Sequence, residues 1–238
     1  MSTKPRVIIL SGYGLNCEDE TAFAFETAGA KAEIVHINDL SGPTAQLKKY
    51  QILAIPGGFS FGDDTGSGKA FAHKLKAKLG DKLHEFLARD TLMIGICNGF
   101  QILTSAGILP GALAHNDSGR YQSEWVEVVA EVGTISPWVP PLIHKRGLGG
   151  VVVPIAHGEG KYIPDQKHPP IVAFRYVDNP NGSVDNIAGI LGYDGRVLGM
   201  MPHPERAQFD WQRPPGLSSG GGSAPGGQIF KNAVNYFL

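Results

Sequence analysis

The first hundred residues alternate short apolar runs with longer helical stretches, and this alternation limits the fold more than any other feature of the chain. Parallel strands need long crossover connections, and helices usually provide them. The pattern therefore predicts an α/β fold: a flavodoxin-like, open, mostly parallel sheet with helices on both faces. The expected strands are 7–10, 33–37, 52–55 and 92–96, and the expected helices lie near 18–28 and 70–89.

From residue 124 the pattern changes to closely spaced strand-like segments, at 125–129, 150–155, 171–176, 187–191 and 196–201. The turn residues Tyr193–Arg196 predict a hairpin between the last two of them. We expect this half to be an antiparallel C-terminal extension, so that residues 1–238 form a single domain. The segment 213–227 is rich in glycine, serine and proline, which predicts a flexible loop. A closing helix at 228–238 should pack on the body through Ile229, Phe230, Val234 and Phe237.

The composition is that of a globular protein with a sizeable core, since 42% of the 238 residues are hydrophobic and 18% are charged. A formal net charge of −1 gives no broad basic surface, so neither nucleic acid nor an anionic membrane is expected as a partner. The apolar stretch Val7–Leu10 is too short for a signal peptide or a spanning helix. We therefore expect a cytoplasmic protein that acts on a small polar substrate or with a protein partner.

The chain has two cysteines, Cys17 and Cys97, and their spacing predicts neither a disulfide framework nor a metal site. Cys17 is expected to be a buried thiol. Cys97 differs, because it stands at the centre of a Gly-x-Cys-x-Gly pattern between an apolar strand and a second apolar run. Gly95 and Gly99 leave room for the sharp turn of a nucleophile elbow, with sulfur in place of oxygen. The pattern thus predicts a cysteine presented for attack.

Glycine-rich loops follow three of the expected strands, at 12–14, 57–60 and 97–99. The carboxyl ends of parallel strands are where open α/β sheets hold ligands, so these loops are expected to form one site. A thiolate that attacks a carbonyl needs N–H donors for the developing oxyanion. The expected donors are the N–H of Asn98 at the helix start and the loop Gly57, Gly58 and Phe59.

A catalytic cysteine needs a base or a positive helix end beside it, and two of the eight histidines are followed at the second position by a carboxylate. Pro204 lies between His203 and Glu205 and favours an extended chain that puts both side chains on one side. Glu205 would then bind one imidazole nitrogen and leave the other facing sulfur. His157 and Glu159 have the same spacing between flexible glycines, and form a second candidate site or interface.

Three segments together carry a family resemblance: Gly95–Gln101, the glycine loop Pro56–Gly62, and Pro202–Glu205. With them the chain resembles the class I glutamine amidotransferases, whose hallmark is a Cys-x-Gly-x-Gln elbow followed far downstream by His-x-Glu. Within that class it is similar to the glutaminase subunits and domains of phosphoribosylformylglycinamidine synthase, from purine biosynthesis. The segments that narrow the resemblance are 57–63, 156–160, 179–183 and 199–206.

The resemblance implies a glutaminase with a Cys-His-Glu triad. In it Cys97 attacks the side-chain amide of glutamine and forms a glutamyl thioester, which water hydrolyses to glutamate. His203 passes the proton to the leaving ammonia, and Glu205 orients His203. The resemblance also implies an oxyanion site and a glutamine pocket that include Gly57, Gly58, Asn98 and Gln101.

The resemblance further implies that the ammonia passes to a partner. The expected partners are the large formylglycinamidine ribonucleotide synthetase subunit and a small bridging subunit. ATP and magnesium are expected on the synthetase, which converts formylglycinamide ribonucleotide to formylglycinamidine ribonucleotide. No cofactor is expected in this chain itself.

Three other interpretations stay open from the sequence. The chain is alternatively an amidotransferase subunit of another pathway, a DJ-1-like cysteine protein, or a docking subunit without activity. Gln101 and Pro202–Glu205 argue against a DJ-1-like redox sensor or aldehyde hydrolase. The intact Cys97, His203 and Glu205 argue against a docking subunit.

Overall fold

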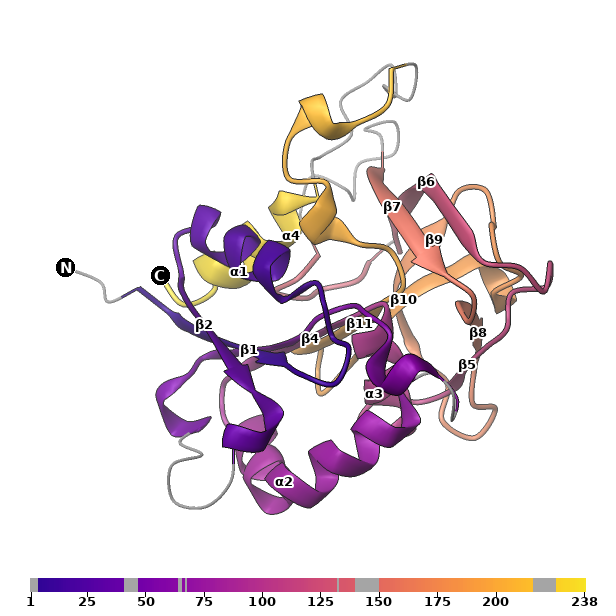
Figure 1. Ribbon diagram of the computed structural model, residues 1–238. Helices are drawn as coiled ribbons and strands as arrows, with labels where there is room; N and C mark the ends of the chain where they lie inside the picture. The colour runs from indigo at the N-terminus through magenta and orange to yellow at the C-terminus, as the bar shows by residue number, and fades with distance from the viewer. Residues whose placement is uncertain are drawn as a thin grey trace.

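A computed structural model describes residues 4–40, 47–63, 66, 68–131, 133–139, 150–215 and 226–238. Within these ranges nine strands form one mixed sheet, in the order β2-β1-β3-β4-β11-β10-β9-β6-β7 (Figure 1). A separate two-stranded sheet pairs β5 with β8 in antiparallel fashion. The short strands of this second sheet, which the sequence pattern did not predict, are Ala112–Ala114 and Lys161–Ile163.

One half of the large sheet is parallel, and its central strands are buried on both faces. Such strands read as continuous apolar runs because helices cover them from both sides. In Figure 1, α1 and α4 lie on one face of the sheet and α2 and α3 lie on the other. The predicted open α/β sheet with a parallel part and helices on both faces is therefore confirmed, although the parallel pairings make up half of the sheet rather than most of it. The strands are β1 (Arg6–Ser11), β2 (Lys31–His36), β3 (Ile52–Ile55), β4 (Leu92–Ile96) and β11 (Val197–Met200).

The helices agree with the predicted positions to within a few residues. They are α1 (Glu18–Thr27), α2 (Lys69–Ala88), α3 (Asn98–Ser105) and α4 (Gly227–Asn235). Short 3-10 helices are η1 (Ile37–Asp39), η3 (Leu47–Lys49), η4 (Ser60–Asp63), η6 (Val184–Asn186), η7 (Pro204–Arg206) and η8 (Asp210–Gln212).

The other half of the sheet is antiparallel, as the closely spaced segments predicted. Burial alternates along much of β6 and β7, because one face of each strand is turned to the core and the other outward. The four strands are β6 (Gln122–Ala130), β7 (Val151–His157), β9 (Ile171–Tyr176) and β10 (Ile187–Gly192).

The last strand, β11, differs from the prediction in its placement. The hairpin with β10 is present, and Arg196 N–H donates to the carbonyl of Tyr193 across its turn at 3.2 Å. However, β11 also pairs in parallel with β4, so it belongs to the parallel half rather than to the antiparallel extension. The reason is that all four residues of β11 are buried apolar or glycine positions, which suit the middle of a sheet. This pairing brings the chain that follows β11 beside the chain that follows β4.

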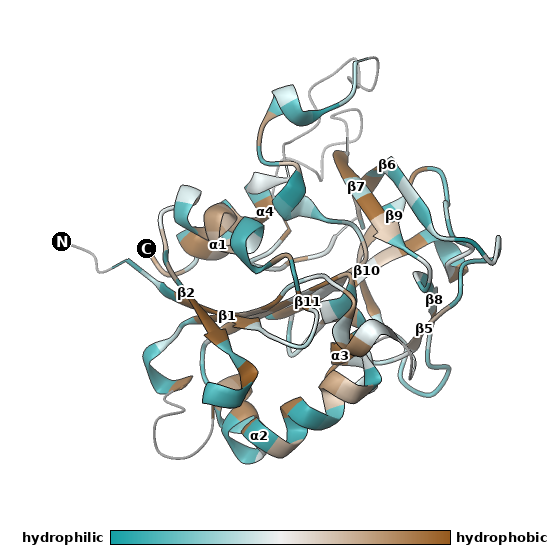
Figure 2. Ribbon diagram, viewed as in Figure 1, coloured by the Kyte–Doolittle hydropathy of each residue, from teal (hydrophilic) through white to brown (hydrophobic). Residues whose placement is uncertain are grey.

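The closing helix packs on the body as predicted. Ile229, Phe230 and Val234 are buried, Phe237 is partly buried against the core, and the Phe230 ring meets Phe25 of α1 edge-on at 4.9 Å between centroids. Figure 2 shows the apolar strands between helices whose outer turns are largely hydrophilic. In the described part of the chain no helix is both long and apolar enough to span a bilayer. Most of the predicted flexible loop, residues 216–225, lies outside the described residues.

Gly99 lets α3 approach β3 closely, and a methyl group there tests how tightly the elbow is packed. A Cβ on Gly99 would overlap the backbone carbonyl of Ile55, which cannot move as a side chain can. We expect Gly99→Ala to lower the free energy of unfolding by about 3 kcal/mol, measured by urea denaturation. The control is Gly158→Ala, where the nearest atom to a new Cβ is 3.9 Å away. Equal effects of the two substitutions would contradict this packing argument.

Candidate active site

Cys97 occupies the strand–turn–helix elbow that the sequence predicted. It lies between β4 and α3 with φ 51° and ψ −107°, a strained conformation for a residue other than glycine. Backbone hydrogen bonds on both sides of Cys97 stabilise this conformation. Its N–H donates to the carbonyl of Met200 in β11 at 2.8 Å. On the other side the carbonyl of Cys97 accepts the first backbone hydrogen bonds of α3. The sulfur therefore lies at the N-terminal end of a helix.

His203 and Glu205 form the pair that their spacing predicted. Nδ1 of His203 and Oε1 of Glu205 are 2.6 Å apart, and each residue is only 2% exposed. The local backbone differs from the expected extended chain, because Pro204 begins the short helix η7. Proline suits the first position of a helix, where its missing N–H has no partner to lose. The tight turn still directs both side chains to the same place, and His203 N–H is anchored on the carbonyl of Pro154 at 2.8 Å.

The surroundings of His203 favour its protonated form. Burial alone lowers its pKa, but the carboxylate of Glu205 and the sulfur of Cys97, with a further contribution from Cys17, hold the pKa well above its usual value. Among the described residues, its Nε2 and the Oε2 of Glu205 are buried and make no hydrogen bond of ordinary geometry. An imidazolium with one nitrogen fixed on a carboxylate is a positioned proton donor.

Cys17 is the site residue that sequence reasoning missed. It was expected to be a buried thiol, and it is fully buried. It also lies in the site, because one ligand atom each of Cys17, His203 and Glu205 lie within 4.8 Å of one another. The only available signal was that Cys17 follows the loop after β1, at the same edge of the sheet as the other site loops.

These three side chains are of types that bind zinc, but a fixed positive charge lies against them. Nη2 of Arg206 donates to Sγ of Cys17 at 2.8 Å, and Nε of Arg206 is 3.9 Å from Oε1 of Glu205. A guanidinium at this distance opposes the binding of a second cation. The expectation that the chain holds no metal stays a prediction.

The glycine loop after β3 passes directly under His203. A Cβ on Gly57 would lie 2.7 Å from Cε1 of His203, so only glycine lets the imidazole approach here. The N–H of Phe59 donates to the carbonyl of Gly14 at 2.9 Å and is therefore occupied. Of the expected oxyanion donors, the backbone N–H groups of Gly57, Gly58 and Asn98 stay our candidates.

The amide of Gln101 connects two walls of the site. Its Oε1 accepts from Nδ2 of Asn98 at 2.7 Å, and its Nε2 donates to the backbone carbonyl of Glu159 at 2.6 Å. Oδ1 of Asn98 in turn accepts from the N–H of Ser60 at 3.3 Å. Both buried amides thus tie α3 to the loops that flank it, which fixes the shape of the space next to Cys97.

The second candidate pair, His157 and Glu159, is not joined. Nδ1 of His157 contacts Oδ1 of Asn116 at 3.1 Å, whereas the carboxylate of Glu159 lies 3.6 Å from Nε2 of His115. Burial, followed by the charge of His203, lowers the pKa of His157 to about 4. His157 is therefore neutral near pH 7 and lacks the carboxylate partner that a pre-oriented base needs.

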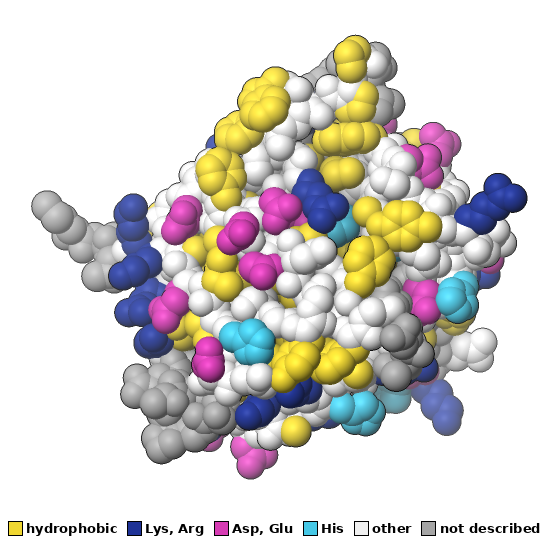
Figure 3. All heavy atoms as spheres, in the orientation of Figure 1, with side chains coloured by type: hydrophobic (Ala, Val, Ile, Leu, Met, Phe, Trp, Pro, Cys, Tyr) yellow, Lys and Arg dark blue, Asp and Glu magenta, His cyan; other side chains and the backbone are white. Residues whose placement is uncertain are grey.

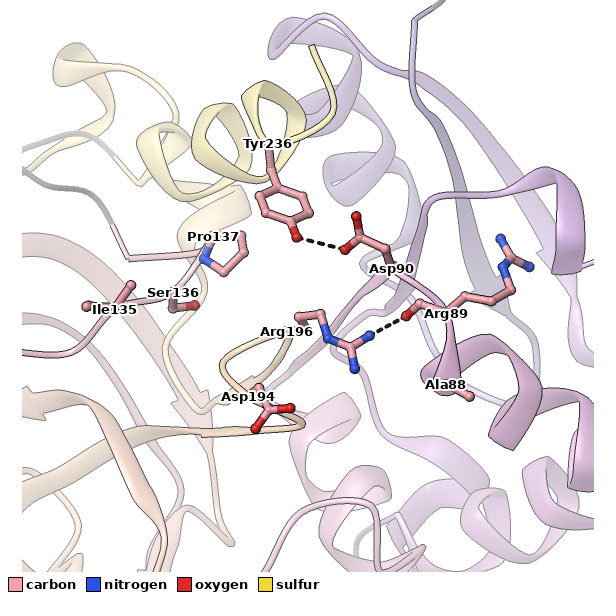
Figure 4. A pocket seen from close by; sticks show the side chains of 9 residues that line it. All are labelled: Ala88, Arg89, Asp90, Ile135, Ser136, Pro137, Asp194, Arg196 and Tyr236. Carbon is pink, nitrogen blue, oxygen red and sulfur yellow. Dashed lines mark hydrogen bonds between the residues drawn. The ribbon is translucent and has the colours of Figure 1, made fainter.

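Two cavities of the structure lie at opposite edges of the sheet. One, of about 480 Å³, adjoins the triad and is lined by Asp19, Glu20, Phe23, Glu205, Arg206, Gln208 and Gln212. The other, of about 660 Å³, is drawn in Figure 4, where the Tyr236 hydroxyl points at Asp90 and donates to its Oδ1 at 2.7 Å. Asp90 and Arg196 precede β4 and β11, so this second cavity lies at the amino ends of the strands, away from Cys97. Open α/β sheets hold ligands at the carboxyl ends of their strands. The first cavity is therefore the better candidate for a ligand site.

Comparisons with known proteins agree with the family resemblance of the sequence. Residues 4–237 match the family model of the CobB/CobQ-like glutamine amidotransferase domain. The chain is 40% identical to the phosphoribosylformylglycinamidine synthase subunit PurQ of Methanococcus maripaludis, with 98% of this chain and 97% of that protein covered. It is 45% identical to the PurQ subunit of Pyrobaculum aerophilum, with 85% and 88% covered. It also superposes on a chain of the PurLQS structure from Thermotoga maritima with a TM-score of 0.83 and 33% identity, covering 99% of this chain and all of that one.

His157 should make the protein lose stability in acid. Its pKa in the folded protein is about 4, below the usual 6.5. Between these two pH values the unfolded chain is protonated at His157 and the folded chain is not, so the folded state loses stability. Between pH 6.5 and pH 4 this costs up to ~3 kcal/mol of unfolding free energy. We expect His157→Gln to flatten that part of the stability profile, measured by urea denaturation, whereas His84→Gln on the surface of α2 should not. A profile unchanged by His157→Gln would contradict the assignment.

Proposed function

The chain belongs to the CobB/CobQ-like glutamine amidotransferases, among the PurQ subunits of phosphoribosylformylglycinamidine synthase, and from this premise we propose that Cys97, His203 and Glu205 are its catalytic triad. The observation that carries the proposal is the strained Cys97 elbow beside a buried His203 that Glu205 holds at 2.6 Å. The pair of His203 with Glu205 is the arrangement that a cysteine nucleophile needs.

In the proposed reaction the Cys97 thiolate attacks the side-chain carbonyl carbon of glutamine, and the carbonyl oxygen becomes an oxyanion. The N–H groups of Gly58 and Asn98 stabilise that oxyanion. The C–N bond then breaks, and the leaving nitrogen takes a proton from His203, which yields ammonia and a glutamyl thioester. His203, now neutral, takes a proton from water as the water attacks the thioester, and glutamate leaves.

The nucleophile is assigned to Cys97 rather than to Cys17, although both sulfurs lie near His203. Cys17 directly precedes α1, is fully buried, and its Sγ accepts a hydrogen bond from the guanidinium of Arg206. Cys97 has the elbow backbone and the helix end that present and activate a nucleophile. In the described part of the chain its Sγ contacts the backbone carbonyl of Ala156 at 3.7 Å and also interacts with the side chain of His203, the contact that a nucleophile needs with its base.

We propose that the ammonia passes to a synthetase subunit that docks next to the triad, with a small subunit bridging the two. A row of aromatic rings supports this site: Phe23 meets Phe209 at 6.1 Å, and Phe209 stacks on Trp211 at 5.6 Å. Trp211 is 78% exposed and Phe23 is 50% exposed, and Phe23 lines the cavity beside Glu205 and Arg206. Figure 3 shows hydrophobic side chains gathered on this face, and exposed aromatic groups of this kind favour protein partners.

The proposed acceptor is formylglycinamide ribonucleotide, which the synthetase activates with ATP and magnesium. The relatives named for this synthase support the assignment. The free thiols Cys17 and Cys97 support a cytoplasmic location, where cysteines stay reduced.

The triad assignment is tested by labelling with a chloroketone analogue of glutamine, followed by peptide mapping. We expect the label on Cys97, and we expect Cys97→Ala to lower glutamine hydrolysis by more than ~10³-fold because no thioester can form. The matched control is Cys17→Ser, which should still be labelled at Cys97. Label on the Cys17 peptide, or full activity of Cys97→Ala, would overturn the assignment.

The docking surface is tested by the affinity for the synthetase subunits from the same source. We expect Trp211→Ala to weaken binding by about tenfold or more, since a large exposed ring at the centre of an interface often dominates its energy. Ile135→Ala is the control, because Ile135 is 92% exposed but lines the cavity at the opposite edge of the sheet. An unchanged affinity of Trp211→Ala would move the interface elsewhere, without bearing on the triad.

A further inference from the structure

Cys17 is a buried thiol in the site that the proposed reaction does not use. Its backbone is held firmly: its N–H donates to the carbonyl of Gly57 at 3.3 Å, and its carbonyl accepts from the Thr21 hydroxyl at 2.7 Å. Its Sγ is therefore a fixed point beside His203. A Cβ on Gly57 would lie 3.3 Å from that sulfur and 2.7 Å from His203, so the three residues are in close contact.

Arg206 lies between two acceptors, the sulfur of Cys17 and the carboxylate of Glu205. Its Nη2 donates to Sγ of Cys17 at 2.8 Å, while its Nε stays 3.9 Å from Oε1 of Glu205, beyond hydrogen-bond distance. That same Oε1 is the atom that contacts Nδ1 of His203 at 2.6 Å. The Nε of Arg206 is buried and has no hydrogen-bond partner in the part of the chain that the structure describes.

Two cationic groups thus compete for one carboxylate oxygen. Arginine and a carboxylate form one of the strongest side-chain pairs, and their attraction grows in a buried site. A movement of about 1 Å would bring Arg206 to the usual hydrogen-bond distance from Glu205. The carboxylate would then divide its charge between Arg206 and His203, and its hold on the imidazolium would weaken.

We propose that Cys17 is a positioning residue: its sulfur holds the Arg206 guanidinium away from Glu205, so that the carboxylate stays committed to His203. The proposal rests on the proposed function, because it concerns the same triad. Cys17 has no part in the bond changes of the proposed reaction; it contacts both His203 and Arg206, and the proposed role is the one exerted through Arg206. The raised pKa of His203, to which Glu205 contributes, agrees with an undivided carboxylate.

The charged and titratable groups around this pair come from η7, β7 and α1 and from the turns before α3 and β6. Glu205 and Arg206 belong to η7, Cys97 precedes α3, and His157 ends β7. Glu20 of α1 acts on Arg206, and Tyr121 senses the charges of both His203 and Arg206. Since all of these groups except Arg206 are the same in the variants below, differences between variants report on Cys17 and Arg206.

The test is a double-mutant cycle on glutamine hydrolysis by the protein in complex with its synthetase. We expect Cys17→Ala to lower kcat about tenfold with little change in KM, whereas Cys17→Ser keeps most of the activity because a hydroxyl still accepts from Arg206. We expect the alkaline limb of the kcat profile of Cys17→Ala to move to lower pH by about one unit, since His203 then loses its proton more readily. In an Arg206→Ala background, Cys17→Ala should change kcat less than about twofold.

The proposal is overturned if Cys17→Ala lowers kcat equally with and without Arg206, or if Cys17→Ser is as inactive as Cys17→Ala. Should Cys17→Ala fail to fold, Cys17→Val replaces it, because valine fills the space without accepting a hydrogen bond. Chloroketone labelling of Cys97 in each variant separates the two proposals. Labelled Cys97 without the expected coupling refutes the role of Cys17 alone, and unlabelled Cys97 in the unmodified protein refutes the triad.

Discussion

The parallel pairing of β11 with β4 is the constraint on which the rest of the site depends. It aligns Met200 with Ile96, and Cys97 N–H donates to the carbonyl of Met200 at 2.8 Å. Cys97 and His203 therefore follow neighbouring strands that end at the same edge of the sheet. About a hundred residues separate them in sequence, yet the backbone hydrogen bonds between β4 and β11 fix their relative positions. Rigid strands suit this purpose, because a catalytic pair tolerates little displacement.

The site brings several charged side chains together where they are shielded from water, and its geometry determines which of them form pairs. His203 and Glu205 are each 2% exposed, so their interaction is strong and little screened by water. Arg206 brings a third charge to the same place, where it could compete with His203 for Glu205. In our proposal the sulfur of Cys17 resolves this competition by binding the guanidinium. The amides of Asn98 and Gln101 brace the neighbouring loops in a similar way, without carrying charge.

Much of the fold was readable in the sequence, because its signals are local. Continuous apolar runs predicted β3, β4 and β9 at their observed bounds, and Tyr193–Arg196 predicted the β10–β11 hairpin. The short strands β5 and β8 escaped prediction, since three residues carry no periodic pattern. The pairing of β11 with β4 was also not predicted. A hairpin pattern indicates that β11 pairs with β10, but it does not indicate which strand pairs with the other side of β11.

The sequence by itself determined the chemistry: an elbow cysteine, a histidine two residues before a glutamate, and glycines where side chains would collide. These depend on residue type and short spacing, which the chain carries directly. Only the tertiary structure decided which groups act together. In the folded chain Glu159 contacts His115 instead of His157, and the N–H of Phe59 is hydrogen-bonded to Gly14. Cys17 and Arg206 lie against His203 and Glu205. Such contacts depend on strand order and on packing between segments that are distant in sequence, so no local sequence pattern predicts them.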